Sequence, residues 1–120
     1  MVRELARKGI NFGSHTANHV ILPLEDESVM KTEIASSKTE LEQQLGRKVV
    51  SFAYPNGEYN RAIKAFTAGA GYKVAVTTEK RINRSGADLL ALGRTSLCEE
   101  STRGIKGRYS AKVAAVRLGV

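Results

Sequence analysis

Two runs of strand-forming residues on either side of one helical segment constrain the fold of this chain most. Residues 49–53 (VVSFA) and 72–78 (YKVAVTT) are rich in β-branched and aromatic side chains, and residues 60–70 between them suit a helix that Gly71 ends. Two strands joined through a helix pair in parallel. The order therefore predicts an α/β fold, in which loops after the carboxyl ends of the strands build the site.

The beginning of the chain shows the same alternation of helix and strand. Residues 2–8 predict the end of a helix, because Gly9 can adopt the left-handed conformation that closes a helix at little cost. Residues 10–12 (INF) predict a short strand after it. The alternation of helix and strand therefore extends to the beginning of the chain.

A long helix is expected between these strands. Asp26 or Ser28 can cap its start after a loop at residues 22–24, and Gly46 ends it. Its apolar residues recur at helical spacing, at Met30, Ile34, Leu41 and Leu45. This spacing predicts a helix that packs inward on one stripe and exposes its charged faces to solvent.

The length of the chain and the composition of its last third limit the possible domain organisation. A chain of 120 residues is long enough for one domain with its own core. Residues 79–88 predict a polar loop, residues 89–94 another strand and residues 109–118 a short helix. We expect a domain at residues 1–95, followed by a basic C-terminal extension at residues 96–120.

The formal net charge of +7 raises the alternative of a nucleic-acid-binding protein. After Glu100 there are five basic residues and no acidic one, at Arg103, Lys106, Arg108, Lys112 and Arg117. This segment has a single aromatic residue, Tyr109, and lacks the interleaved aromatic and basic residues of a single-strand-binding surface, which argues against nucleic acid as a partner. The alternative predicts affinity that falls steeply with salt and disappears when residues 101–120 are removed.

Composition indicates a soluble globular protein with no membrane partner. Hydrophobic residues make up 42% and charged residues 26% of the chain, and no apolar run is long enough to span a bilayer. The single cysteine, Cys98, excludes an intramolecular disulfide. Because the first residues are charged and show no signal peptide, the sequence assigns no compartment.

Both histidines of the chain lie in residues 13–19 (GSHTANH), directly after the predicted strand at residues 10–12. The imidazoles of His15 and His19 are four residues apart, so they can point the same way and share a metal ion. Solvated or capping histidines are the common alternative for such a pair. A second candidate loop, residues 54–57 (YPNG), follows the strand at 49–53 and is expected at the same end of the sheet, although a plain turn would have the same composition.

Three segments together resemble the polysaccharide deacetylase family, carbohydrate esterase family four. They are residues 13–19, 51–57 and 70–78, in the order and spacing of that family, and the resemblance runs from about residue 2 to residue 94. It implies a distorted (β/α) barrel, present here as a partial barrel that lacks its first strand or strands. It also implies a hydrolase that removes N-acetyl groups from a glycan such as chitin or peptidoglycan, with zinc or a similar divalent metal.

The resemblance also implies roles for single residues. His15 and His19 would be the two imidazole ligands of the metal ion. The main-chain N–H of Asn56 would stabilise the oxyanion that forms when activated water attacks the acetamide carbonyl. Tyr54 and Pro55 would line the sugar-binding groove. In the family a Thr-Phe-Asp-Asp type segment upstream supplies the third ligand and the general base.

The sequence departs from the family pattern in three places. It contains no Thr-Phe-Asp-Asp type segment, it has Ala53 where many members have arginine, and it has no histidine after His19 to act as general acid. Two imidazoles alone predict weak metal binding, because a hydrolytic zinc site needs three protein ligands. The alternative is a catalytically dead glycan-binding remnant. Because a barrel without its first strands exposes sheet edges, we expect a homo-oligomer or association with a separately encoded piece.

Overall fold

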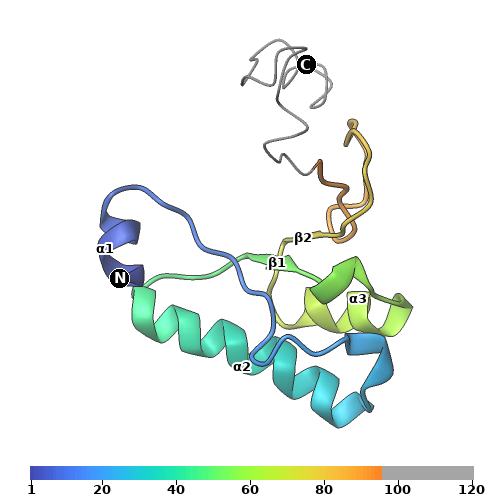
Figure 1. The fold of residues 1–120 in the computed structure, drawn as a ribbon, viewed down its shortest axis with the longest axis horizontal. Helices are drawn as coiled ribbons and strands as arrows, with labels where there is room; N and C mark the ends of the chain where they lie inside the picture. Colours follow the sequence, from blue (N-terminus) through green and yellow to red (C-terminus); the bar gives the residue numbers. More distant parts are fainter. Residues whose placement is uncertain (96–120) are drawn as a thin grey trace, which may run out of the picture.

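The computed structural model describes residues 1–95 and shows an α/β arrangement of short strands and longer helices (Figure 1). In chain order the elements are α1 (Val2–Arg7), the 3-10 helix η1 (Leu22–Leu24), α2 (Glu27–Leu45), β1 (Ser51–Ala53), the 3-10 helix η2 (Pro55–Gly57), α3 (Arg61–Gly69) and β2 (Val74–Val76). None of the helices in residues 1–95 is long and apolar enough to cross a membrane. The basic extension and the helix expected at residues 109–118 lie outside the described residues.

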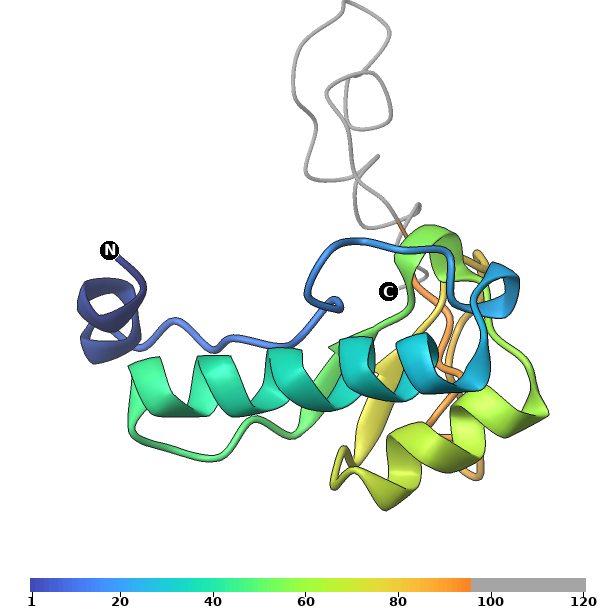
Figure 2. The same cartoon turned by 90° about the horizontal axis from the view of Figure 1, so that it is seen from below.

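Strands β1 and β2 pair in parallel, which confirms the prediction from their order in the sequence. Phe52 lies opposite Ala75 in the register, and both side chains are buried. Figures 1 and 2 show α2 and α3 on the same side of the two strands, with α1 beside the C-terminal end of α2. The chain crosses from β1 to β2 through α3, and the parallel pairing leaves the carboxyl ends of both strands at one edge.

The long helix α2 begins and ends where the sequence predicts. The carboxylate of Asp26 accepts the backbone N–H of Val29 at 2.8 Å, and Gly46 adopts a left-handed φ of 69° at the C-cap. Four residues of α2 are buried, at Met30, Glu33, Ile34 and Ser37. Two of them, Glu33 and Ser37, are polar. The inward stripe of α2 is therefore not wholly apolar, and its polar members face the candidate site described below.

Aromatic rings fill the core between the helices and the sheet. The ring of Phe52 lies 5.4 Å from that of Tyr54 and 5.0 Å from that of Tyr72, measured between centroids. The remaining buried apolar residues of this cluster are Leu22, Met30, Ile34, Val49, Ile63 and Ala75. Short helices and strands have little stability of their own. Burial of this apolar area is therefore the main stabilising contribution to the fold.

Two predictions near the beginning of the chain need correction. Residues 10–12 do not form a strand, and the pairing with β1 is limited to a single bridge between Ser14 and Phe52. The backbone of Ile10 is engaged elsewhere, because its N–H donates to the Leu5 carbonyl and its carbonyl accepts the Arg47 guanidinium. Residues 22–24, expected as a loop, form η1.

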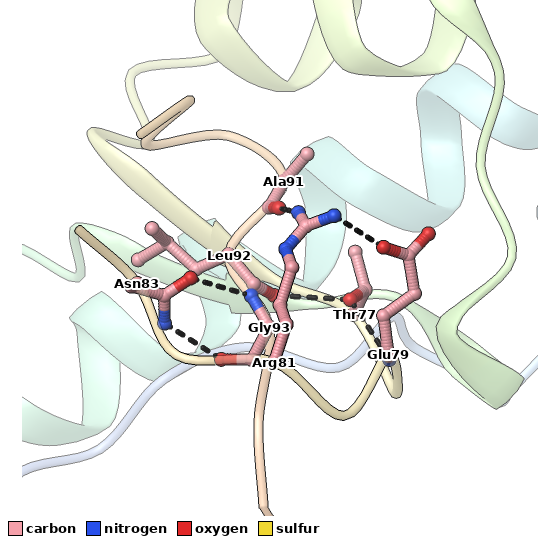
Figure 3. A network of polar contacts seen from close by, with 7 residues as sticks. All are labelled: Thr77, Glu79, Arg81, Asn83, Ala91, Leu92 and Gly93. Atoms are coloured by element: carbon pink, nitrogen blue, oxygen red, sulfur yellow. Dashed lines mark hydrogen bonds and ion pairs between the residues drawn. The ribbon is translucent and has the colours of Figure 1, made fainter. Parts of the chain in front are cut away.

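The polar loop expected after β2 is present, but the strand expected at residues 89–94 is reduced to one bridge between Val76 and Leu92. Backbone hydrogen bonds still join this segment to β2, from the Ala75 N–H to the Leu89 carbonyl and from the Leu92 N–H to the Ala75 carbonyl, and side chains add further contacts. Figure 3 shows their contacts, which involve Thr77, Glu79, Arg81, Asn83, Ala91, Leu92 and Gly93. The Asn83 amide bonds both backbone groups of Gly93, accepting its N–H at 2.9 Å and donating to its carbonyl at 2.8 Å.

Candidate functional site

The histidine loop, residues 14–19, begins where the chain pairs with β1. Ser14 donates its N–H to the Ser51 carbonyl at 2.9 Å, and its carbonyl accepts the N–H of Ala53 at 2.8 Å. The exposed ring of His15 then turns back onto β1, with Nδ1 2.7 Å from the carbonyl oxygen of Ala53. Because a carbonyl can only accept, Nδ1 carries the proton, and Nε2 of the neutral ring keeps a free lone pair. This is the arrangement of a metal-ligating histidine.

The second histidine lies against the first. The ring centroids of His15 and His19 are 4.7 Å apart and the rings are inclined by 70°. The loop reaches this geometry through left-handed backbone at two residues that are not glycine, Thr16 with φ 67° and His19 with φ 56°. Such conformations are uncommon for residues with a side chain, and for the β-branched Thr16 especially so. The surrounding structure therefore has to hold the loop in place.

The chemistry of the donor set fits two positions of a metal site. Two adjacent imidazoles are ligands that zinc accepts, and the hydrogen bond from His15 Nδ1 to Ala53 fixes one of them. Among residues 1–95 no group of three or more His, Cys, Asp or Glu side chains comes together to hold a metal ion. The described part of the chain thus supplies two ligands and no third.

Glu33 on α2 anchors the far side of the histidine loop. Its Oε2 accepts the backbone N–H groups of Ala17 at 2.9 Å and Asn18 at 2.8 Å, and its Oε1 accepts Nδ2 of Asn18 at 2.7 Å. The residue is only 6% exposed. Burial alone would raise the pKa of this carboxyl, but the hydrogen bonds from Asn18 and Ala17 outweigh it and hold the pKa below its ordinary value.

Sequence reasoning missed Glu33, although a signal for it exists. Glu33 lies three residues after Met30 and next to Ile34, which places it on the inward stripe of α2. Ser37 lies on the same stripe, and its hydroxyl bonds that of Ser14 at 2.5 Å. A polar side chain at a core position of a helix requires a buried partner. Here both partners are in the histidine loop.

The second candidate loop meets the first at the end of β1. Ala53, which accepts the His15 ring, is followed directly by the turn that contains Asn56. Asn56 is exposed, has a left-handed φ of 56°, and its carbonyl accepts the hydroxyl of Thr78 at 3.2 Å. The expected meeting of the two loops at the carboxyl end of β1 is therefore present in the structure.

Tyr54 and Pro55, expected to line a sugar-binding groove, lie in the core instead. Tyr54 is 0% exposed, its ring stacks on that of Tyr59 with centroids 4.9 Å apart, and its hydroxyl donates to the Leu90 carbonyl at 2.8 Å. Pro55 is also buried. The sequence does not show whether an aromatic ring at the end of a strand faces the core or the surface. Here the ring of Tyr54 lies in the core, and its buried hydroxyl has the Leu90 carbonyl as hydrogen-bond acceptor.

The buried hydroxyl of Tyr54 gives a prediction for alkaline pH. Burial raises the pKa of Tyr54 from 10.0 to about 12, so its neutral form contributes stability that is complete below pH 10 and is lost as the pH rises toward 12. We expect Tyr54→Phe to lose less unfolding free energy than the wild type across that interval, in denaturant titrations followed by circular dichroism. Tyr59→Phe is the control, and an unchanged alkaline loss in Tyr54→Phe would contradict the prediction.

Comparisons with known proteins agree on one family. The family model described as Polysaccharide deacetylase matches residues 1–75. The chain is similar to the structure of the deacetylase PplD from Streptococcus pyogenes, solved in complex with acetate, with 36% identity and a TM-score of 0.74 over 77% of this chain. It is also similar to BC0361, a polysaccharide deacetylase from Bacillus cereus, with 30% identity and a TM-score of 0.70 over 78% of this chain.

The chain spans well under half the length of these relatives. It covers 41% of the PplD structure and 30% of the BC0361 structure. A curated relative, YxkH from Bacillus subtilis (strain 168), is 27% identical over 108 residues, which are 90% of this chain and 39% of YxkH.

Proposed function

Because this chain belongs to the polysaccharide deacetylase family, we propose that it supplies the two-histidine part of a metal-dependent N-deacetylase acting on N-acetylated glycans. The observation that supports this most is the pair of imidazoles, 4.7 Å apart and beside the end of β1. A plain solvated pair would need neither the fixed Nδ1 of His15 nor the left-handed backbone at His19.

In this proposal His15 and His19 hold zinc or a similar divalent ion through their imidazoles. The third ligand, a carboxylate, comes from outside residues 1–95, because these residues bring no third ligand to the pair. When bound, the ion would activate water and polarise the acetamide carbonyl. The Nδ1–H bond to Ala53 holds His15 in the tautomer that binds, and sets the direction of its Nε2.

The role proposed for the second loop is to stabilise the oxyanion. The Asn56 turn is fixed on both sides, by the Gly57 N–H donating to the Tyr54 carbonyl at 2.8 Å and by the Thr78 hydroxyl bound to the Asn56 carbonyl. A main-chain donor fixed in this way needs little reorganisation when charge develops on the substrate. We propose the N–H of Asn56 for this role, three residues along the chain from Ala53, on which the His15 ring rests.

A second candidate function is binding of a glycan without turnover. The donor set of residues 1–95, which holds two ligands, favours it, together with Ala53 at a position where many family members have arginine. Under either function we propose self-association through the sheet. In the described residues the sheet has two strands flanked by single bridges, and a second copy could pair along such an edge.

Acetate release separates the two functions. The full chain is incubated with chitooligosaccharides and zinc, acetate is measured enzymatically, and the molar mass is determined by light scattering in the same buffer. Zinc-dependent acetate that chelation abolishes supports the deacetylase, and a mass of two or more chains supports a shared site. Oligosaccharide affinity in calorimetry without acetate supports the binding function. Neither acetate nor affinity would contradict both proposals.

A further inference from the structure

Glu33 makes an unusual set of contacts for a carboxylate on a long helix. Its three hydrogen bonds all go to two adjacent residues of the histidine loop, Ala17 and Asn18, which lie between the two histidines. In the described residues it forms no ion pair, unlike Glu27 or Glu42, which bond lysines one turn away on the same helix. The only groups that compensate for burying this charge are therefore in the loop.

This arrangement is costly unless the loop geometry matters. A buried carboxylate loses its hydration, and the cost falls only when hydrogen bonds replace it. Two of the N–H donors converge on one oxygen, Oε2, so the carboxylate requires successive backbone N–H groups to point the same way. The left-handed residues Thr16 and His19 lie on either side of these two donors. They turn the chain so that both N–H groups point toward the carboxylate.

We propose that Glu33 is a positioning residue that holds the histidine loop in the conformation that brings His15 and His19 together. The carboxylate fixes the two residues between the histidines, so loss of its hydrogen bonds frees the strained backbone at Thr16 and His19 to relax to right-handed or extended φ. The rings would then separate. The consequence for metal binding rests on the function proposed above, whereas the consequence for loop geometry does not.

The first test needs no metal. In the full wild-type chain, nuclear Overhauser effects should connect the ring protons of His15 and His19, because the centroids are 4.7 Å apart. Glu33→Ala should lose this effect while retaining the one between the rings of Phe52 and Tyr72 in the core. Glu33→Gln keeps an acceptor for the two backbone N–H groups and should retain the histidine contact in weakened form.

A matched control separates hydrogen bonding from charge. Glu40 lies on the same helix, is exposed, and lines a cavity of about 290 Å³ together with His15 and Thr16. Glu40→Gln removes the same negative charge without touching the bonds to Ala17 and Asn18, and should keep the contact between the histidine rings. Asn18→Ala removes one of the three bonds without altering α2, and it serves if Glu33→Ala does not fold.

The second test measures zinc affinity by calorimetry. Loss of a group that orients a metal ligand commonly weakens binding about 10- to 100-fold, and this is the decrease expected for Glu33→Ala. Glu33→Gln and Asn18→Ala should show smaller decreases, and Glu40→Gln should stay within about twofold. A change confined to the thermal unfolding midpoint, with ring contact and zinc affinity intact, would show that Glu33 serves stability alone and overturn the proposal.

The two tests fail in distinguishable ways. If the wild type shows the contact between the histidine rings but binds no zinc, the proposed metal function fails while the Glu33 variants still decide the positioning role. If Glu33→Ala keeps the ring contact of the wild type, the positioning role is overturned whatever the zinc affinity. If Glu33→Ala does not fold, the role is overturned when Asn18→Ala leaves both the ring contact and the zinc affinity unchanged. Loss of the ring contact in Glu40→Gln as well would point to charge rather than hydrogen bonds and would also overturn it.

Discussion

Replacing either histidine by alanine is expected to reduce the zinc affinity of this chain by about 100-fold or more. Removal of a group that merely orients a ligand already costs about 10- to 100-fold, so removal of one of the two imidazole ligands should cost at least the upper end of that range. His15→Ala and His19→Ala should behave alike, because the proposed site uses both rings. The measurement is calorimetric titration of zinc into the purified chain at neutral pH.

Stability separates this loss from misfolding. Both histidines are exposed, and within residues 1–95 only His15 has a side-chain hydrogen bond, to Ala53. Each substitution should therefore change the unfolding free energy by less than about 1 kcal/mol. Asn11→Ala, at an exposed residue just before the loop, is the control and should leave zinc affinity unchanged. Zinc binding that survives in either histidine variant would show that the pair does not share an ion.

Gly57→Ala is expected to destabilise the fold more than Gly46→Ala, although both glycines have nearly the same φ. Their φ values are 72° and 69°, and an alanine in this left-handed region costs roughly 1–2 kcal/mol at either position. At Gly46 an added Cβ meets nothing within 4 Å. At Gly57 it would lie 2.5 Å from the backbone nitrogen of Thr78 and close to its side chain, and relieving that clash adds about 1–3 kcal/mol.

The pair of glycine variants isolates the packing of the Asn56 turn against β2. Chemical denaturation should show a larger loss of unfolding free energy in Gly57→Ala by about the cost of the clash, and the amide resonances of Asn56 and Thr78 should shift. Gly46→Ala should leave those resonances in place, because it acts at the end of α2. Equal destabilisation in the two variants would mean that the Asn56 turn moves away from Thr78 at no cost in free energy. The main-chain N–H of Asn56 would then not be held rigidly.

Local signals in the sequence determined the helices and the strand order. Capping residues set the ends of α2, with Asp26 bonded to Val29 and Gly46 in the left-handed conformation, and Asn60 caps α3 through the N–H of Ile63. The parallel pairing of β1 and β2 follows from their separation by α3. These features depend on residues a few positions apart, which is why they are readable without the fold.

What could not be predicted depends on contacts between distant residues. The segment at residues 10–12 has strand composition, yet Arg47 takes the carbonyl of Ile10 and the ladder is left with one bridge. By sequence, Tyr54 could face a groove or the core. In the structure its buried hydroxyl donates to the carbonyl of Leu90, which is 36 residues away. The same holds for Glu33, whose partners in the histidine loop lie 15 and 16 residues before it.

X-ray absorption at the zinc edge of the zinc-loaded chain shows whether His15 and His19 hold one metal ion together. We expect two imidazole nitrogens at about 2.0–2.1 Å from the zinc, with oxygen ligands completing the coordination. A spectrum with one imidazole or none would contradict this expectation, because the ion would then be bound elsewhere or by a single ring.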